Sequence, residues 1–124
     1  MNLFVYGTLL EEAESDPEHQ AGQISGFKMF DIGAFPGVVR TKDPTDKVVG
    51  VMFPVSAENL EAFDHYEGYH EDDHDISLYL REEIDVTVPG GRTERAWVYI
   101  FNQDTTNLEV IPTGSWRERG LVKL

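Results

Sequence analysis

The chain has 124 residues, with 23 Asp and Glu against 10 Lys and Arg, a formal net charge of -13, and no cysteine. This length predicts a single domain over residues 1–124, and the lack of cysteine excludes disulfides, thiolate metal sites and cysteine nucleophiles. The negative charge repels phosphate backbones and anionic lipids, and the basic residues are scattered, so we expect neither a nucleic-acid nor a membrane partner. The first six residues lack the basic start and long apolar stretch of a signal peptide, which predicts a cytoplasmic protein.

Four segments of the first half carry the apolar runs typical of short strands. They are residues 2–6, 23–32, 38–40 and 48–55. Gly7 ends the first, and turn-forming residues at 36–37 and 43–46 precede the last two. Residues 10–19 are acidic and contain Pro17, which predicts a loop with one helical turn.

One helix is predicted between Ser56 and Gly68. Ser56 is a typical N-cap, and glycine is the usual residue just beyond a helix C-terminus. The face predicted to pack on the core is made by residues at the spacing i, i+3 and i+7: Leu60, Phe63 and Glu67. Asp64 is expected on the solvated side. The pattern therefore places a carboxylate, that of Glu67, on an apolar face.

The second half predicts a β-hairpin. Residues 79–88 and 95–101 have strand patterns and flank the turn sequence at 89–91, whereas residues 69–77 form an acidic loop. The tail from Asn102 onward is predicted to be irregular. The whole chain is thus expected to be an α+β domain with a curled, mostly antiparallel sheet of about six strands and one main helix.

Glu67 is the first candidate for catalysis. Burying a carboxylate disfavours its charged form and raises its pKa toward neutrality, where it can accept and return a proton. Two other interpretations stay open: the side chain reaches solvent at the helix end, or it pairs with Arg81.

The loop made by Tyr6, Gly7, Thr8 and Leu9 is a candidate anion-binding turn. A buried strand runs directly into it, and glycine permits a backbone in which successive N–H groups point the same way. The alternative is an ordinary turn at a strand end.

Histidines and acids also gather at the end of the helix and in the loop after it. His70 and His74 have the i, i+4 spacing of a helical metal site. The segment, however, follows Gly68 and is crowded with like charges, which favours a solvated loop. A metal-dependent hydrolase is kept as an alternative, although we expect no metal.

The chain resembles the γ-glutamylcyclotransferase-like family in several segments that occur in the family's order. The matching segments are FVYGTL (4–9), DIGAFPGVV (31–39), VGVMF (49–53), FDHYEGY with SLYLR (63–81), AWVYI (96–100) and IPTGSWR (111–117). The resemblance implies a small, mixed β-barrel with a helix against its mouth. It also implies cyclisation of a γ-glutamyl amide to 5-oxoproline, with release of the amine or amino acid.

The resemblance further implies the roles of the site residues. Glu67 matches the family's acid/base, and Tyr6, Gly7, Thr8 and Leu9 match the loop that holds the glutamyl group. Tyr79 and Arg81 match positions beside the pocket, and the resemblance implies that they also bind the substrate. The expected partner is a small γ-glutamyl substrate, with no cofactor or metal, and the expected state is a monomer or weak homodimer.

One departure from the family concerns residues 10–15, LEEAES, where relatives often carry a basic residue and a glycine. If this acidic stretch borders the leaving group, it predicts a cationic one, such as a lysine or polyamine.

Two alternatives to this enzyme are a non-catalytic small-molecule binding module on the same fold and a protein-interaction domain.

Overall fold

The computed structural model describes residues 1–120, which contain eight strands, two α-helices and one 3-10 turn. The strands are β1 (Asn2–Val5), β2 (Gln20–Ser25), β3 (Phe27–Asp31), β4 (Pro36–Arg40), β5 (Lys47–Pro54), β6 (Tyr79–Thr87), β7 (Thr93–Phe101) and β8 (Glu109–Ile111). The helices are α1 (Leu10–Glu14) and α2 (Ala57–Tyr66), and the 3-10 turn is η1 (His74–Ile76).

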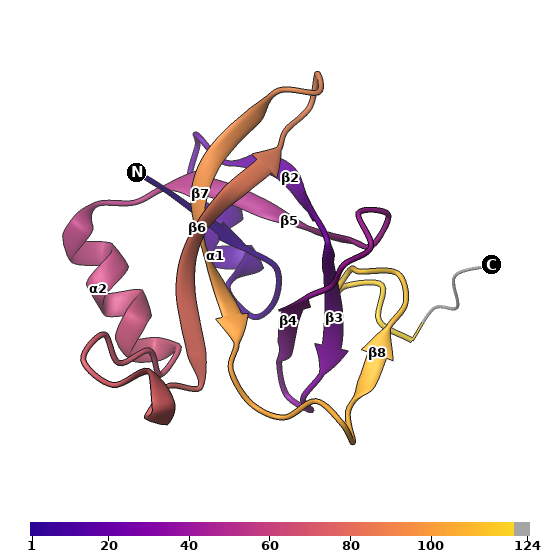
Figure 1. Cartoon of the computed structure of the whole chain (residues 1–124). Coiled ribbons are helices and arrows are strands. Elements are labelled where there is room, and N and C mark those ends of the chain that lie inside the picture. The colour runs from indigo at the N-terminus through magenta and orange to yellow at the C-terminus, as the bar shows by residue number, and fades with distance from the viewer. Residues whose placement is uncertain (121–124) are drawn as a thin grey trace.

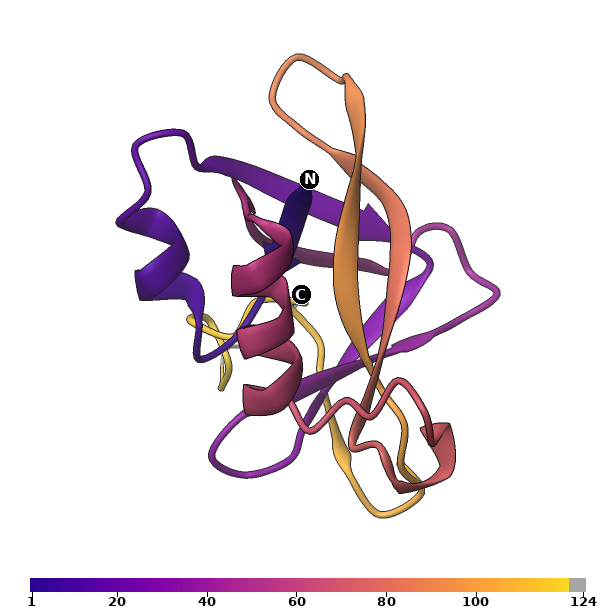
Figure 2. The ribbon, with the colours of Figure 1, turned by 90° about the vertical axis from the view of Figure 1, so that its left-hand side faces the viewer.

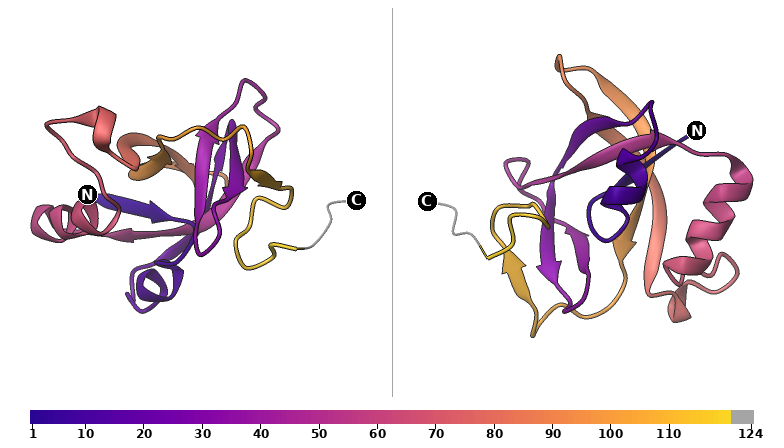
Figure 3. Two further views of the ribbon diagram at one scale, coloured as in Figure 1. Left: turned by 90° about the horizontal axis from the view of Figure 1, so that it is seen from below. Right: turned by 180° about the vertical axis from the view of Figure 1, so that it is seen from behind.

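Five strands close into a barrel in the order β1-β5-β2-β6-β7 (Figure 1). All neighbouring pairs are antiparallel except β1 with β7, where Leu3 lies opposite Trp97 in a parallel pairing that closes the ring. The other three strands form a second sheet, β4-β3-β8, on the side of the barrel away from α2 (Figures 1 and 3). The predicted α+β class with a mixed, mostly antiparallel barrel is confirmed.

Two details of the strand prediction are wrong. Residues 23–32 do not form one strand, because Gly26 has a φ of +79° and turns the chain from β2 in the barrel to β3 in the second sheet. The tail is not wholly irregular, since β8 pairs with β3 and places Ile111 opposite Met29. A three-residue strand has no periodicity that sequence inspection could detect. These two differences raise the strand number from about six to eight.

The barrel interior depends on a close approach between β1 and β5. Phe4 of β1 is completely buried. A Cβ at Gly50 of β5 would lie 2.7 Å from the Phe4 ring and closer still to the carbonyl oxygen of Val5. Only glycine therefore fits at this position, and it lets β1 sit against β5 with the Phe4 ring turned inward.

Helix α2 begins and ends as predicted. The Ser56 hydroxyl accepts a hydrogen bond from the Asn59 N–H at 3.1 Å, and Gly68 has the positive φ of +66° expected after a helix C-terminus. Leu60 is buried, and the Phe63 ring packs edge-on against Phe53 of β5 with their centroids 5.9 Å apart. Figure 2 shows α2 lying between α1 and the β6–β7 hairpin. Its apolar face thus fixes the helix on the barrel wall.

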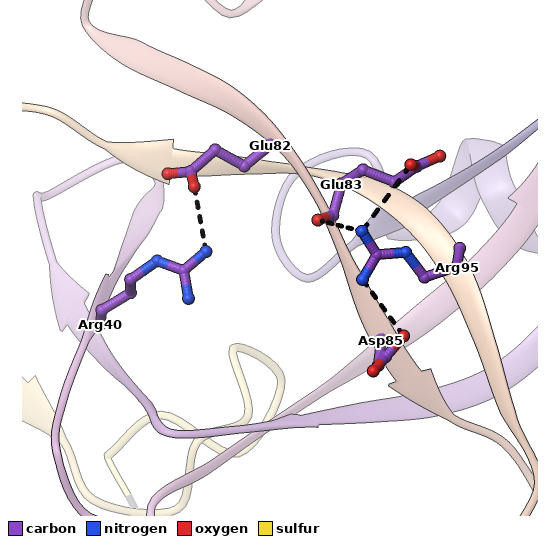
Figure 4. Close-up of polar contacts among 5 residues, drawn as sticks. All are labelled: Arg40, Glu82, Glu83, Asp85 and Arg95. Carbon is purple, nitrogen blue, oxygen red and sulfur yellow. Dashed lines mark hydrogen bonds and ion pairs between the residues drawn. The ribbon is translucent and has the colours of Figure 1, made fainter.

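Exposed ion pairs lie on the outer face of the hairpin (Figure 4). Arg40 is 3.0 Å from Glu82, and Arg95 is 3.2 Å from Asp85 and 3.8 Å from Glu83. These side chains are about half exposed, so each pair contributes only about 0.2–1 kcal/mol to stability. They provide matched controls for ionic groups that are buried.

Within residues 1–120, neither helix has the length and the apolar composition that crossing a bilayer would require.

We predict that Gly50→Val destabilises the fold by about 3 kcal/mol, because the added carbons collide with Phe4 and the β1 backbone. Thermal unfolding followed by circular dichroism measures the loss. Val49→Ala is the control, since Val49 is the preceding residue of β5 and is 41% exposed. If Gly50→Val melts within a degree or two of the wild type, β1 and β5 are not packed as closely as described.

Candidate active site

A narrow pocket opens where the C-terminal end of α2 meets the loop after β1. It has a volume of about 320 Å³, counting the open space at its mouth. Three separate segments line it together with β1 and β7: the 6–9 loop, the turn before β4, and the end of α2. The lining residues are Phe4, Val5, Tyr6, Gly7, Thr8, Leu9, Phe35, Pro36, Glu67 and Tyr99. Of the residues singled out from the sequence, Tyr6, Gly7, Thr8, Leu9 and Glu67 meet here.

Glu67 reaches the pocket because it immediately follows the last turn of α2. Its N–H donates to the Phe63 carbonyl at 2.9 Å, and Gly68 then turns the chain away from the barrel. Burial raises the pKa of Glu67 from 4.5 to about 7. The sequence alternative in which Glu67 pairs with Arg81 is wrong, because Arg81 pairs with Asp64. Glu67 is therefore a partly buried carboxyl that can exist in either protonation state near neutral pH.

The 6–9 loop is held against the second sheet by close packing at Gly7. A Cβ at Gly7 would lie 2.6 Å from the Pro36 ring, so the loop backbone passes directly beside that proline. The loop closes with a hydrogen bond from the Leu10 N–H to the Gly7 carbonyl at 3.1 Å. Among residues 1–120, no acceptor is found for the backbone N–H groups of Gly7, Thr8 and Leu9. These donors remain available to a ligand.

Three buried tyrosines surround the carboxyl, and each donates its hydroxyl proton to the protein. Tyr6 donates to the Tyr99 carbonyl at 2.6 Å, Tyr79 to the Pro36 carbonyl at 2.6 Å, and Tyr99 to the Asp64 carboxylate at 2.7 Å. Burial raises the pKa of all three well above the usual value, and the nearby Glu67 adds to the shift. The tyrosines are thus neutral, and their hydrogen bonds tie the 6–9 loop, β4, β6, β7 and α2 together around the pocket.

Tyr79 and Arg81 lie near this pocket without lining it. The Tyr79 hydroxyl is bound to the Pro36 carbonyl, as described above. The Arg81 guanidinium lies over the rings of Trp97 and Tyr69, 4.4 and 5.3 Å from their centroids. Tyr79 therefore contacts the pocket wall at Pro36, whereas the contacts of Arg81 are with residues outside the pocket lining.

Asp64 and Tyr99 are site residues that the sequence analysis missed. Asp64 is not on the solvated side as expected, because its side chain is only 16% exposed and its Oδ1 lies 2.8 Å from Arg81 Nε. The signal available in the sequence was the i, i+3 spacing of Asp64 and Glu67, which puts the two carboxylates on neighbouring parts of the helix surface. Nothing in the local pattern identified Tyr99, whose place follows from the β6–β7 pairing.

The histidine-rich segment lies outside the pocket. His70 begins a turn held by Ser77, whose buried hydroxyl accepts from the His70 N–H at 2.7 Å, and the His74 ring packs against Tyr69. Among residues 1–120, no three His, Asp or Glu side chains converge as metal ligands would.

The acidic residues after the pocket loop form the helix α1. Leu10 and Ala13 are buried, while Glu11 and Glu12 are exposed one turn from the pocket residue Leu9. Glu14 pairs with Arg117, whose Nη1 lies 2.8 Å from the carboxylate. Among residues 1–120, Glu11 and Glu12 therefore form no ion pair, and their carboxylates lie near the 6–9 loop.

Residues 3–118 match the model of the family described as "Gamma-glutamyl cyclotransferase, AIG2-like". The chain belongs to this family. It is 31% identical to the gamma-L-glutamyl-butirosin B gamma-glutamyl cyclotransferase of Niallia circulans over 111 residues, which cover 83% of this chain and 68% of that protein. Membership makes the protein an enzyme of the gamma-glutamyl cyclotransferase kind.

Solved structures show the same fold. Protein ytfP of Escherichia coli is 22% identical with a TM-score of 0.65, and the match covers 98% of this chain and all of that one. An AIG2-like protein of Mus musculus is 20% identical with a TM-score of 0.64, over 85% of this chain and 79% of that one. The barrel with its second sheet is therefore the fold of the family.

We predict that Glu67 makes stability depend on pH. Because its pKa is raised from 4.5 to about 7 on folding, the stability that its proton contributes is complete below pH 4.5 and is lost as the pH rises through about 7. The melting temperature of Glu67→Gln should therefore rise relative to the wild type between about pH 5 and about pH 8. Glu71→Gln, at an exposed carboxylate nearby, is the control and should follow the wild type. If the melting temperatures of Glu67→Gln and the wild type change in parallel with pH, Glu67 is solvated.

Proposed function

We propose that this protein cyclises a γ-glutamyl amide to 5-oxoproline and releases the attached amine, with Glu67 as the acid/base. The observation that carries the proposal is the Glu67 carboxyl, which burial holds near a pKa of about 7 in a pocket that also presents unused backbone N–H groups. Family membership supports the same reaction type.

The reaction joins two ends of one molecule. The α-amino nitrogen of the glutamyl group attacks its own γ-carbonyl carbon, which closes a five-membered ring. The bond from that carbon to the leaving nitrogen then breaks. A pocket that holds the glutamyl group bent keeps its amino nitrogen close to its γ-carbonyl carbon. This lowers the entropic part of the activation barrier. Binding the glutamyl group in a bent conformation is thus the first task of the 6–9 loop.

Glu67 accounts for the first and last proton movements of the reaction. The α-amino group is mostly protonated at neutral pH, so the Glu67 carboxylate must first remove a proton from it. After ring closure the ring nitrogen loses its second proton to water. The protonated Glu67 carboxyl gives its proton to the leaving nitrogen as the amide bond breaks. A pKa of about 7 suits both steps, because neither protonation state is strongly favoured at that pH.

The tetrahedral intermediate carries a negative oxygen that needs hydrogen-bond donors. The free N–H groups of Gly7, Thr8 and Leu9 line the same pocket as Glu67 and are the candidate donors. Close packing of Gly7 on Pro36 holds the loop in place before substrate arrives, which is what effective stabilisation of an oxyanion requires.

The proposed leaving group is a cationic amine. Glu11 and Glu12 lie exposed on α1, directly after the pocket loop, while Glu14 is neutralised by Arg117. Their charges attract a cation that extends from the pocket mouth toward α1. The Niallia circulans relative is named for a γ-glutamyl conjugate, which supports a γ-glutamyl group carried on a larger molecule.

We predict that Glu67→Gln lowers turnover by about 10²- to 10⁴-fold and leaves the fold intact, because glutamine has the same shape but cannot accept the proton. The measurement is 5-oxoproline release by mass spectrometry across a panel of γ-glutamyl amides. Glu61→Gln, at an exposed carboxylate of α2, is the matched control and should retain full activity.

A Glu67→Gln variant with activity within tenfold of the wild type would remove Glu67 from the mechanism. If the folded wild type releases no 5-oxoproline from any amide but binds 5-oxoproline, the non-catalytic binding module replaces the enzyme. Calorimetric titration with 5-oxoproline separates the two.

We predict that replacing Glu11 and Glu12 together by Gln lowers kcat/KM about 3- to 10-fold for a cationic leaving group, because two attractive charges are lost at the pocket mouth. The value for a neutral leaving group should change less than about twofold. The control is the pair Glu82→Gln and Glu109→Gln, which changes the net charge equally on β6 and β8. Equal losses on both substrate types would show that α1 does not select the leaving group.

A further inference from the structure

We propose that Asp64 and Arg81 are positioning residues, which act through Tyr99 and Tyr69 to hold Glu67 in the pocket. This inference rests on the proposed role of Glu67 as acid/base. It assigns Arg81 a task different from contact with substrate, which the sequence resemblance implied.

Asp64, Arg81, Tyr99 and Tyr69 form a connected array of side chains, which begins with a cross-strand pair. Arg81 of β6 lies directly opposite Tyr99 of β7 in the antiparallel ladder, so their side chains share one face of the hairpin. Asp64 of α2 contacts both of them: its Oδ1 lies 2.8 Å from Arg81 Nε and accepts the Tyr99 hydroxyl at 2.7 Å. One carboxylate thus joins the last turn of α2 to two adjacent strands of the barrel.

The guanidinium holds the chain on both sides of Glu67. Asp64 precedes Glu67 by three residues, and Tyr69 follows it by two. Arg81 pairs with the first and lies 5.3 Å from the ring centre of the second, while the Trp97 ring lies 4.4 Å from it. The Tyr69 N–H also donates to the Asp64 carbonyl at 2.9 Å, which closes the loop around Glu67. Glu67 therefore lies in a short segment with both ends fixed by one side chain.

The contacts of Arg81 with Asp64 and Tyr69, called the clamp below, are largely buried, unlike the other arginine pairs of the hairpin. The side chains of Arg81 and Asp64 are 14% and 16% exposed, whereas those of Arg95 and Asp85 are 57% and 66% exposed. A charge pair that is largely removed from water gains rigidity from its aromatic neighbours, and guanidinium stacks on such rings better than ammonium does. Arginine rather than lysine is therefore suited to the position.

The clamp also keeps the surroundings of Glu67 close to neutral. The groups that face Glu67 are Tyr6 from the 6–9 loop, Tyr79 from β6, Tyr99 from β7, and Asp64 with Arg81 behind them. The tyrosines are uncharged, and Asp64 and Arg81 compensate each other. Burial is then the cause that sets the pKa of Glu67, and a looser clamp that admits water would lower it.

The experiment compares four variants: Asp64→Asn, Arg81→Lys, Tyr99→Phe and, as control, Arg95→Lys. Two properties are measured on each folded protein, the kcat and KM for 5-oxoproline release and the titration midpoint of the Glu67 carboxyl by carbon NMR. Tyr99→Phe removes one oxygen and keeps the ring, so it retains the packing if the other variants unfold.

For Asp64→Asn, Arg81→Lys and Tyr99→Phe we expect kcat to fall about 10-fold or more while KM changes less than about threefold, since a displaced acid/base impairs the chemical step. The Glu67 midpoint should fall by about one pH unit in Tyr99→Phe, which changes no charge, as the carboxyl gains water. In Asp64→Asn it should fall further, because the Arg81 charge is then uncompensated. Arg95→Lys should match the wild type in both measurements.

The inference is overturned if Asp64→Asn and Tyr99→Phe melt at lower temperature yet keep the wild-type kcat and Glu67 midpoint, because the array would then be structural only. If Arg81→Lys keeps the wild-type kcat, a positive charge at position 81 is sufficient, and stacking on the aromatic rings does not position Glu67. The titration needs no turnover. If the wild type cyclises no γ-glutamyl amide but Tyr99→Phe still lowers the midpoint, the proposed function fails and the positioning role stands.

Discussion

The burial of one carboxyl group without a counter-ion is the constraint on which the rest of the site depends. Removing Glu67 from water disfavours its charge, and the raised pKa records that cost. The protein tolerates the arrangement because neighbouring polar groups pair with one another. The Tyr6 and Tyr79 hydroxyls donate to backbone carbonyls, and Asp64 accepts from Tyr99 and forms an ion pair with Arg81. The site thus leaves one titratable group free to exchange a proton and holds the others fixed.

The barrel supplies this site by bringing together segments that are far apart in the chain. The parallel pairing of β1 with β7 carries the 6–9 loop to the same end of the barrel as Tyr99. The second sheet contributes Pro36, which packs on Gly7, and α2 contributes Glu67. Glycine is required where these backbones nearly touch, so Gly7 and Gly50 support the geometry of the pocket as much as the residues that face it.

Local sequence signals were sufficient for the elements and for the central residue. The N-cap, the stop at Gly68 and the i, i+3, i+7 spacing located α2 and placed Glu67 on its apolar side, as the structure shows. Local signals were insufficient where pairing between distant segments determines the strand boundaries or the burial of a side chain. The strand break at Gly26 and the strand β8 depend on a second sheet that no local period reveals. Asp64 was assigned to solvent because helical spacing alone cannot show that Arg81 and Tyr99, from a distant hairpin, cover it.

Two arginines of one hairpin differ in burial, and the difference shows why the burial of the Arg81–Asp64 ion pair matters. Arg95 and Arg81 both pair with carboxylates at similar distances, 3.2 and 2.8 Å. Water screens the exposed pair, so the position of its partner hardly depends on it. Around Arg81, the rings of Trp97 and Tyr69 exclude water, and the loss of either charged partner would leave the other buried and unpaired. Because Asp64 and Tyr69 flank Glu67 in the chain, any movement that relieved that imbalance would also move Glu67. A fold that buries a carboxyl for the proposed proton transfers therefore gains from burying the ion pair that holds it.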